Sequence, residues 1–162
     1  MKKILNRILP KAYGSYFNFL VLFSRRKAAK KAFNLFCTPR KGKVLEHQKS
    51  FLDSAKSGTI EADGVDFQTY HWEGKKDTVL LLHGWESNSF RWQNLIAFLK
   101  KEEFDIIALD APAHGYSTSK TFTAPLYAKG IKPVVEKYRP QHILAHSIGG
   151  MSALYYHHKF NE

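Results

Sequence analysis

Three short apolar runs constrain the fold of this 162-residue chain more than any other feature of its sequence. They are TVLLLHG at 78–84, DIIALDA at 105–111 and HILAHS at 142–147. Runs that are apolar on both faces are typical of strands buried between two layers of helices. Helical patterns at 90–101 and 125–138 separate the three runs. This alternation predicts an α/β fold with a doubly wound, mostly parallel sheet, helices on both faces and right-handed crossovers.

An antiparallel hairpin is expected before the first run. Residues 59–74, TIEADGVDFQTYHWEG, alternate between apolar and polar side chains on either side of Asp63 and Gly64. Asp-Gly in such a pattern is a strong turn signal. We therefore assign residues 58–162 to one α/β body.

Positive charge is concentrated before this body. Residues 1–57 contain fourteen of the 25 lysines and arginines and only two acids, a net charge of +12, whereas the rest of the chain has a net charge of −1. The segment contains two stretches with helical i, i+4 spacing, the first interrupted by Pro10 and Gly14 and the second ended by Pro39 and Gly42. We therefore predict a basic helical N-terminal arm over residues 1–57.

Two functions are open for this arm. Either it packs on the body as a helical extension with a solvated charged face, or it lies on anionic lipid as a basic amphipathic anchor. Its apolar stretch at 15–23 is shorter than the ~20 residues needed to cross a bilayer, and we expect no export signal. A single cysteine, Cys37, suits the cytoplasm, with the inner face of the membrane as the alternative location. Charge without a recognition motif does not predict nucleic-acid binding.

Polar loops rich in small residues follow all three apolar runs. They contain HGW at 83–85, DAPAHGYS at 110–117 and AHSIGG at 145–150. Because the carboxyl ends of parallel strands meet at one edge of a sheet, we expect these loops to lie together there.

The third loop places a serine at a bend between a strand and a helix. Close packing of the strand against the helix leaves no room for large side chains two residues before and two residues after the serine. Small residues are therefore needed at both positions, and Ala145 and Gly149 occupy them. The bend exposes the Ser147 hydroxyl beside the N–H groups of the helix start. A second donor is expected from the Trp85 N–H, because Gly84 lets the backbone turn close to a substrate.

The motifs LLLHGW, LDAPAHGYS and AHSIGG, in this order and spacing, resemble those of the α/β-hydrolase superfamily, in particular its bacterial esterases and lipase-like members. The resemblance covers about residues 60–160. It implies that Ser147 is the nucleophile for an ester or related acyl substrate, and that the N–H groups of Trp85 and Ile148 form the oxyanion hole. It also implies a nucleophile elbow made of Ala145, His146, Gly149 and Gly150, and we expect neither a cofactor nor a metal.

The end of the sequence departs from the pattern of this superfamily, whose triad acid and histidine come later in the chain than the serine. After Ser147 the sequence offers only His157, His158 and Glu162. His157 is about 15 Å along the helix from the serine, whereas a general base must approach to about 3.2 Å. We therefore expect the N-terminal portion of a longer hydrolase, inactive alone. The alternative is a non-catalytic accessory module that binds a membrane or partner through its arm.

Other polar and aromatic residues have structural interpretations. By resemblance, His83 and Asp110 shape their loops, and His146 projects to the other side of the elbow. His114 is either a locally hydrogen-bonded loop residue or a substitute base. The aromatic side chains of Trp85, Phe90 and Trp92 either line an acyl pocket or belong to the core. The strand at 142–147 is expected to be an unpaired sheet edge open to association.

Overall fold

The computed structural model describes residues 2–160, with side chains described from residue 8 onward. It contains two compact units, Met1–Thr38 and Pro39–Glu162, and each is described by itself below. Within the described residues, no helix is long and apolar enough to cross a membrane.

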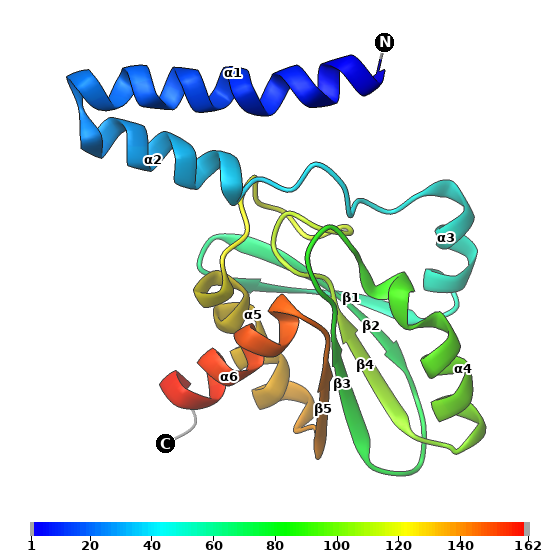
Figure 1. The fold of residues 1–162 in the computed structure, drawn as a ribbon. Coiled ribbons are helices and arrows are strands. Elements are labelled where there is room, and N and C mark those ends of the chain that lie inside the picture. The colour runs from blue at the N-terminus through cyan, green and yellow to red at the C-terminus, as the bar shows by residue number, and fades with distance from the viewer. Residues whose placement is uncertain (1, 161–162) are drawn as a thin grey trace. The chain divides into compact units, whose positions relative to one another are not determined.

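The first unit consists of two helices, α1 (Lys2–Phe23) and α2 (Arg25–Phe36), which pack against each other (Figure 1). We call this pair the N-terminal hairpin. Ser24 caps α2 by accepting a hydrogen bond from the Lys27 N–H, and the Lys31 ammonium group donates to the Tyr16 hydroxyl across the two helices at 2.6 Å.

The expected interruption of the first helix is wrong, because α1 runs continuously through Pro10 and Gly14. Proline lacks only its own N–H and disturbs one turn, so hydrogen-bonded turns on both sides can carry the helix past it. A Cβ at Gly14 would meet nothing within 4 Å, so no turn or close contact requires glycine there.

The second unit is built on a five-stranded sheet in the order β1-β2-β4-β3-β5 (Figure 1). The strands are β1 (Lys56–Ala62), β2 (Val65–Trp72), β3 (Thr78–Leu82), β4 (Asp105–Leu109) and β5 (His142–Ala145). Strand β2 pairs antiparallel with β1 and β4, whereas β3 lies parallel between β4 and β5. Asp63 and Gly64, at the turn of the predicted hairpin, both have positive φ angles of 55° and 73°. The predicted mostly parallel α/β architecture is confirmed.

Helices cover both faces of this sheet. Helices α3 (Glu46–Leu52) and α4 (Gln93–Lys101), the latter preceded by the 3-10 turn η1 (Ser89–Trp92), lie on one side, and α5 (Ala124–Tyr138) and α6 (Ile148–Phe160) on the other (Figure 1). Alternate residues of β3 explain the two layers. Leu80 and Leu82 join the core beneath α5, whereas Leu81 joins the core beneath α4.

Residues 39–57, which we expected to belong to the arm, pack with the second unit. Leu52 is fully buried in the core beneath α4, and the ring of Phe51 stacks on that of Trp72 at 5.4 Å. The Trp72 indole N–H also donates to the Ser54 hydroxyl at 3.0 Å. The division between units therefore falls after Thr38 rather than after residue 57.

The substitution Leu52→Ala tests this packing. We expect it to lower the free energy of unfolding by about 2–5 kcal/mol, because it removes a fully buried side chain and leaves a cavity. Leu45→Ala is the matched control, since Leu45 belongs to the same segment and is 56% exposed. Urea denaturation measures both variants, and equal effects would contradict a packed segment.

Candidate active site

Ser147 lies on a sharp bend between β5 and α6. Its φ angle is 55°, in the left-handed region that residues with a Cβ rarely adopt, and its side chain is exposed. The bend is closed by backbone hydrogen bonds from the Gly149 N–H to the His146 carbonyl at 3.0 Å and from the Gly150 N–H to the Ser147 carbonyl at 2.9 Å. The expected strained corner is therefore present at this serine.

Close backbone packing explains the glycine two residues after Ser147. A Cβ on Gly149 would lie 2.6 Å from the His83 carbonyl oxygen and 2.7 Å from that of Leu82. Both atoms belong to the backbone at the end of β3, so they cannot move aside as a flexible side chain would. Ala145, by contrast, ends the exposed strand β5, where alanine is accommodated.

The loop after β3 lies directly against this bend. A Cβ on Gly84 would lie 3.1 Å from the Ser147 Cβ and 2.9 Å from the His146 Nδ1. His146, which we expected to project to the other side of the elbow, thus has its ring beside Gly84. The structure brings the HGW and AHSIGG loops together at the carboxyl edge of the sheet.

The two expected oxyanion donors belong to these adjoining segments. Trp85 follows Gly84, and Ile148 is the first residue of α6, where backbone N–H groups have no acceptor in their own helix. The Trp85 side chain is 37% exposed, and its ring meets those of His114 and Phe122 edge-on. The roles of Trp85 in binding substrate and of both N–H groups stay predictions.

Asp110 is buried and saturated with hydrogen bonds. Its Oδ1 accepts from the N–H and hydroxyl of Ser89 at 2.8 and 2.7 Å, and its Oδ2 accepts from the Tyr70 hydroxyl and the Tyr116 N–H at 3.0 and 3.1 Å. Gly115 has a φ angle of 49°, and a Cβ there would overlap this carboxylate. These contacts hold the loop together, which agrees with the structural role expected of Asp110.

His83 and His114 are both fully buried and use both ring nitrogens on the backbone. The Nε2 of His83 accepts from the Ala111 N–H at 2.9 Å, and its Nδ1 donates to the Gly84 carbonyl at 2.8 Å. His114 likewise accepts from the Glu86 N–H at 3.0 Å and donates to the Pro112 carbonyl at 2.8 Å. Desolvation by burial lowers the pKa of His83 and lowers that of His114 to about 4.

These bonds favour the structural interpretation of His114 over its use as a substitute base. A ring with both nitrogens engaged has none left to take the proton of Ser147. Neither His83 nor His114 hydrogen-bonds to the Ser147 hydroxyl. Within the part of the chain that the structure describes, no cluster of three or more His, Cys, Asp or Glu side chains could hold a metal.

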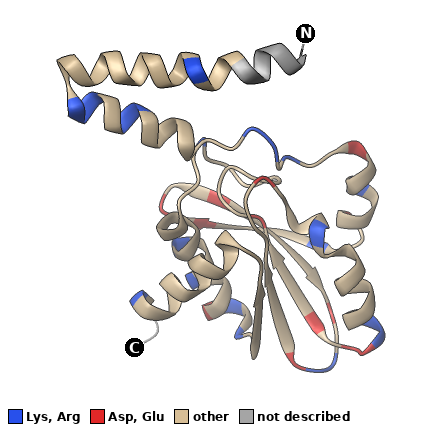
Figure 2. Ribbon diagram, viewed as in Figure 1, with Lys and Arg blue, Asp and Glu red and all other residues tan. Residues whose placement is uncertain are grey.

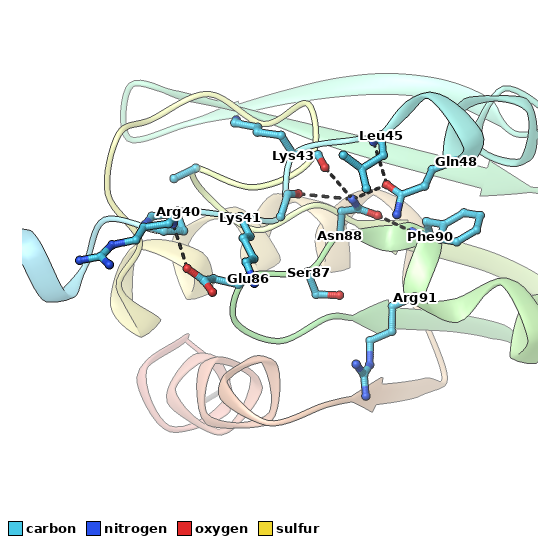
Figure 3. A pocket seen from close by; sticks show the side chains of 13 residues that line it. Arg40, Lys41, Lys43, Leu45, Gln48, Glu86, Ser87, Asn88, Phe90 and Arg91 are labelled. Carbon is cyan, nitrogen blue, oxygen red and sulfur yellow. Dashed lines mark hydrogen bonds between the residues drawn. The ribbon is translucent and has the colours of Figure 1, made fainter. Parts of the chain in front are cut away.

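A cavity of about 600 Å³, which sequence reasoning missed, lies beside this edge (Figure 3). Its walls come from residues 39–48, from 86–91 after β3, and from Ala113 after β4. The Asn88 amide joins the first two walls by donating to the Gln48 side chain at 2.9 Å and to the Gly42 carbonyl at 3.3 Å. The charged residues of the lining are four cations and one carboxylate, Glu86, which accepts a hydrogen bond from the Arg40 N–H. The cationic side chains are those of Arg40, Lys41, Lys43 and Arg91.

Sequence reasoning missed this cavity because it assigned residues 39–57 to a separate arm. The sequence signal that could have found it is the glycine within the basic run RKGK at 40–43, because glycine there indicates a turn rather than a continuing helix. In the structure Gly42 does have a φ angle of 97°. Ser147 is not among the residues that line the cavity.

Two glycines of the bend provide a matched test of its packing. Gly149→Ala is expected to lower the free energy of unfolding by about 1–3 kcal/mol, as overpacking does, because the new Cβ meets backbone oxygens. Gly150→Ala should instead raise it by about 0.5–1 kcal/mol, since a Cβ there meets nothing within 4 Å and alanine favours the helix. Urea denaturation measures both, and equal changes would contradict the close approach.

The buried histidines predict a pH dependence of stability. His114 titrates near pH 4 in the folded chain and near 6.5 when unfolded, so between these values the unfolded chain binds more protons. The free energy of unfolding should therefore decrease as the pH falls through this window. His114→Gln should make that decrease shallower, whereas the exposed control His158→Gln should not. Denaturation curves across the window measure the slopes, and an unchanged slope in His114→Gln would contradict the assignment.

Comparison with known proteins identifies the fold. Residues 77–162, just over half of the chain, match the family model described as the alpha/beta hydrolase fold. A serine hydrolase-like protein of Danio rerio is 34% identical over 88 residues, which are 48% of this chain and 27% of the relative. A bifunctional esterase/perhydrolase, DCH, of Acinetobacter calcoaceticus is 35% identical over 101 residues, 58% of this chain and 36% of the relative.

Solved structures share the fold. The crystal structure of epoxide hydrolase VrEH1 from Vigna radiata superimposes with a TM-score of 0.56 and 19% identity, over 65% of this chain and 36% of that one. The chain spans about a third of the length of the curated relatives it matches. The family match and the fold together show that this chain belongs to the alpha/beta hydrolase fold family.

Proposed function

We propose that this chain supplies the nucleophile and the oxyanion donors of a serine hydrolase that acts on carboxylic esters by acyl transfer. The observation that carries the proposal is the exposed Ser147 at a φ angle of 55°, with Gly84 packed against it. A serine is held in this conformation only where the surrounding backbone leaves it no other, and such strain is concentrated at functional sites.

The reaction follows from the arrangement. The Ser147 hydroxyl oxygen attacks the ester carbonyl carbon and loses its proton to a base, while the carbonyl electron pair moves to oxygen. The N–H groups of Trp85 and Ile148 donate to that oxyanion. Collapse of the tetrahedral species expels the alcohol, which takes up a proton, and water then releases the acid by the same steps in reverse.

The base and its orienting acid are proposed to come from residues outside this sequence. His83 and His114 already use both ring nitrogens, and His158 lies in the last turn of α6. Without a base, both acylation and deacylation are slow, and only the oxyanion donors and substrate binding remain.

The named relatives support the substrate class. One is called an esterase and perhydrolase and another a serine hydrolase-like protein, and both names fit acyl transfer through a serine. The 162-residue chain is expected to hydrolyse p-nitrophenyl acetate several orders of magnitude more slowly than a complete serine esterase does.

A mass-spectrometric experiment tests the nucleophile. After prolonged incubation with p-nitrophenyl acetate, we expect an acetyl group on Ser147, because no base activates the water that would remove it. Ser57, an exposed serine on β1, is the internal control, and Ser147→Ala should lose the adduct. Acetylation of Ser147 no greater than that of Ser57 would overturn its role. Rapid turnover that Ser147→Ala abolishes would overturn the absence of a base.

A further inference from the structure

We propose that the N-terminal hairpin, α1 and α2, is a binding surface for anionic lipid membranes. Nothing in the proposal rests on Ser147 or on the chemistry at the sheet edge, because the hairpin is a compact unit of its own. Three features of the hairpin support this proposal: its charge, its exposed apolar side chains and their arrangement along the helices.

The charge of the hairpin has one sign. Residues 1–38 contain nine lysines and arginines and no aspartate or glutamate. In Figure 2 the coloured parts of both helices carry basic residues and no acidic one. All of the basic side chains that the structure describes here are exposed: Lys11, Arg25, Arg26, Lys27, Lys30 and Lys31.

The same helices expose large apolar side chains. Leu22 and Phe36 are 81% and 82% exposed. The other exposed apolar and aromatic side chains of the hairpin are Ile8, Leu9, Tyr13, Tyr16, Phe19, Val21, Phe23 and Phe33. The surface of a soluble protein rarely carries so many large apolar side chains on two helices, and such a concentration marks an interaction site.

These side chains follow the helix period. Ile8, Phe19 and Phe23 are separated by eleven residues and by four, which are about three turns and one turn of an α-helix, so they share one side of α1. Phe17 and Leu20, three residues apart, are half-buried. Helix α1 therefore has one side on which apolar side chains are half-buried and another on which they are exposed.

Anionic lipid is the partner that satisfies both features. Apolar side chains of an interfacial helix enter the boundary between headgroups and acyl chains, while lysines and arginines attract the acidic headgroups. A second copy of the hairpin would bring nine like charges against nine others. Nucleic acid would use the charge and the exposed aromatic rings, but it would leave the exposed aliphatic side chains of Ile8, Val21 and Leu22 in water, whereas lipid buries them.

Co-sedimentation of the full chain with vesicles tests the proposal. We expect binding to vesicles of phosphatidylcholine with phosphatidylglycerol, much weaker binding to phosphatidylcholine alone, and weakening of the former by salt. Replacing Arg25, Arg26, Lys27 and Lys30 by glutamine should reduce the partition coefficient about a thousandfold, at about 1 kcal/mol per charge. Leu22→Ser with Phe23→Ser should reduce it by about tenfold or more, through lost apolar burial.

Matched variants separate the hairpin from the rest of the protein. Glutamine at four exposed lysines of the other unit, Lys100, Lys101, Lys120 and Lys159, changes the net charge equally and should alter binding far less. Phe98→Ser, at a side chain that is 59% exposed on α4, controls for the loss of an apolar group. Circular dichroism confirms that each variant retains its helices.

Two results would overturn the proposal. One is equal effects of the hairpin variants and their controls on binding to anionic vesicles. The other is the absence of binding to anionic vesicles by a folded chain, whether or not that chain binds a double-stranded DNA fragment through the same four basic residues. Both are independent of ester hydrolysis, so a failure of the proposed function leaves this measurement intact.

Discussion

The hydrogen bonds of the buried Asp110 carboxylate are the interactions on which the loops at the carboxyl edge of the sheet depend. It accepts hydrogen bonds from three separate parts of the second unit: Tyr70 on β2, Ser89 in η1 and Tyr116 in the loop after β4. A buried carboxylate is stable only when donors replace the water that it has lost. Its four bonds therefore fix the relative positions of these three segments at one edge.

The two buried histidines extend this network from side chains to backbone. Through its Nε2, His83 holds the loop after β4 at Ala111, while its Nδ1 holds its own loop at Gly84. His114 reaches back to the Glu86 N–H, which ties the loop after β4 to the loop after β3. Neutral rings suit this arrangement, since each must accept one bond and donate another. The low pKa of His114 is the consequence of this burial.

The strain at Ser147 is sustained by these rigid neighbours. A left-handed conformation at a residue with a Cβ costs about 1–3 kcal/mol and persists only where the surroundings impose it. Gly149 lets α6 start against the end of β3, and Gly84 lets the adjoining loop approach the serine. The spacing of small residues around the serine was sufficient to predict this bend, and the apolar runs were sufficient to predict the strands. Both signals are local and reflect packing that only a few residue types permit.

Features that depend on distant contacts were not predictable in the same way. Residues 39–57 have the basic composition of the preceding helices, yet Leu52 is buried beside Tyr70 and Trp72 of β2. Nothing in the segment itself identifies that partner, so the domain boundary and the cationic cavity were both missed. Pro10 is the opposite case, because a strong local signal for a break was overridden by the continuity of α1 on both sides of it.

The exposed surfaces of the two units differ in their chemistry. Strand β5 pairs with β3 and, within residues 2–160, has no second neighbour in the sheet, so its outer backbone N–H and carbonyl groups can pair with another strand. The helices of the N-terminal hairpin satisfy their own backbone groups and present side chains that are mostly apolar or cationic. The backbone groups of a strand edge pair with the backbone of another polypeptide. Cationic and apolar side chains on a helix instead suit the proposed membrane surface, which has acidic headgroups over an apolar interior. The same chain therefore combines a strand edge that forms directional hydrogen bonds with a helical face that does not.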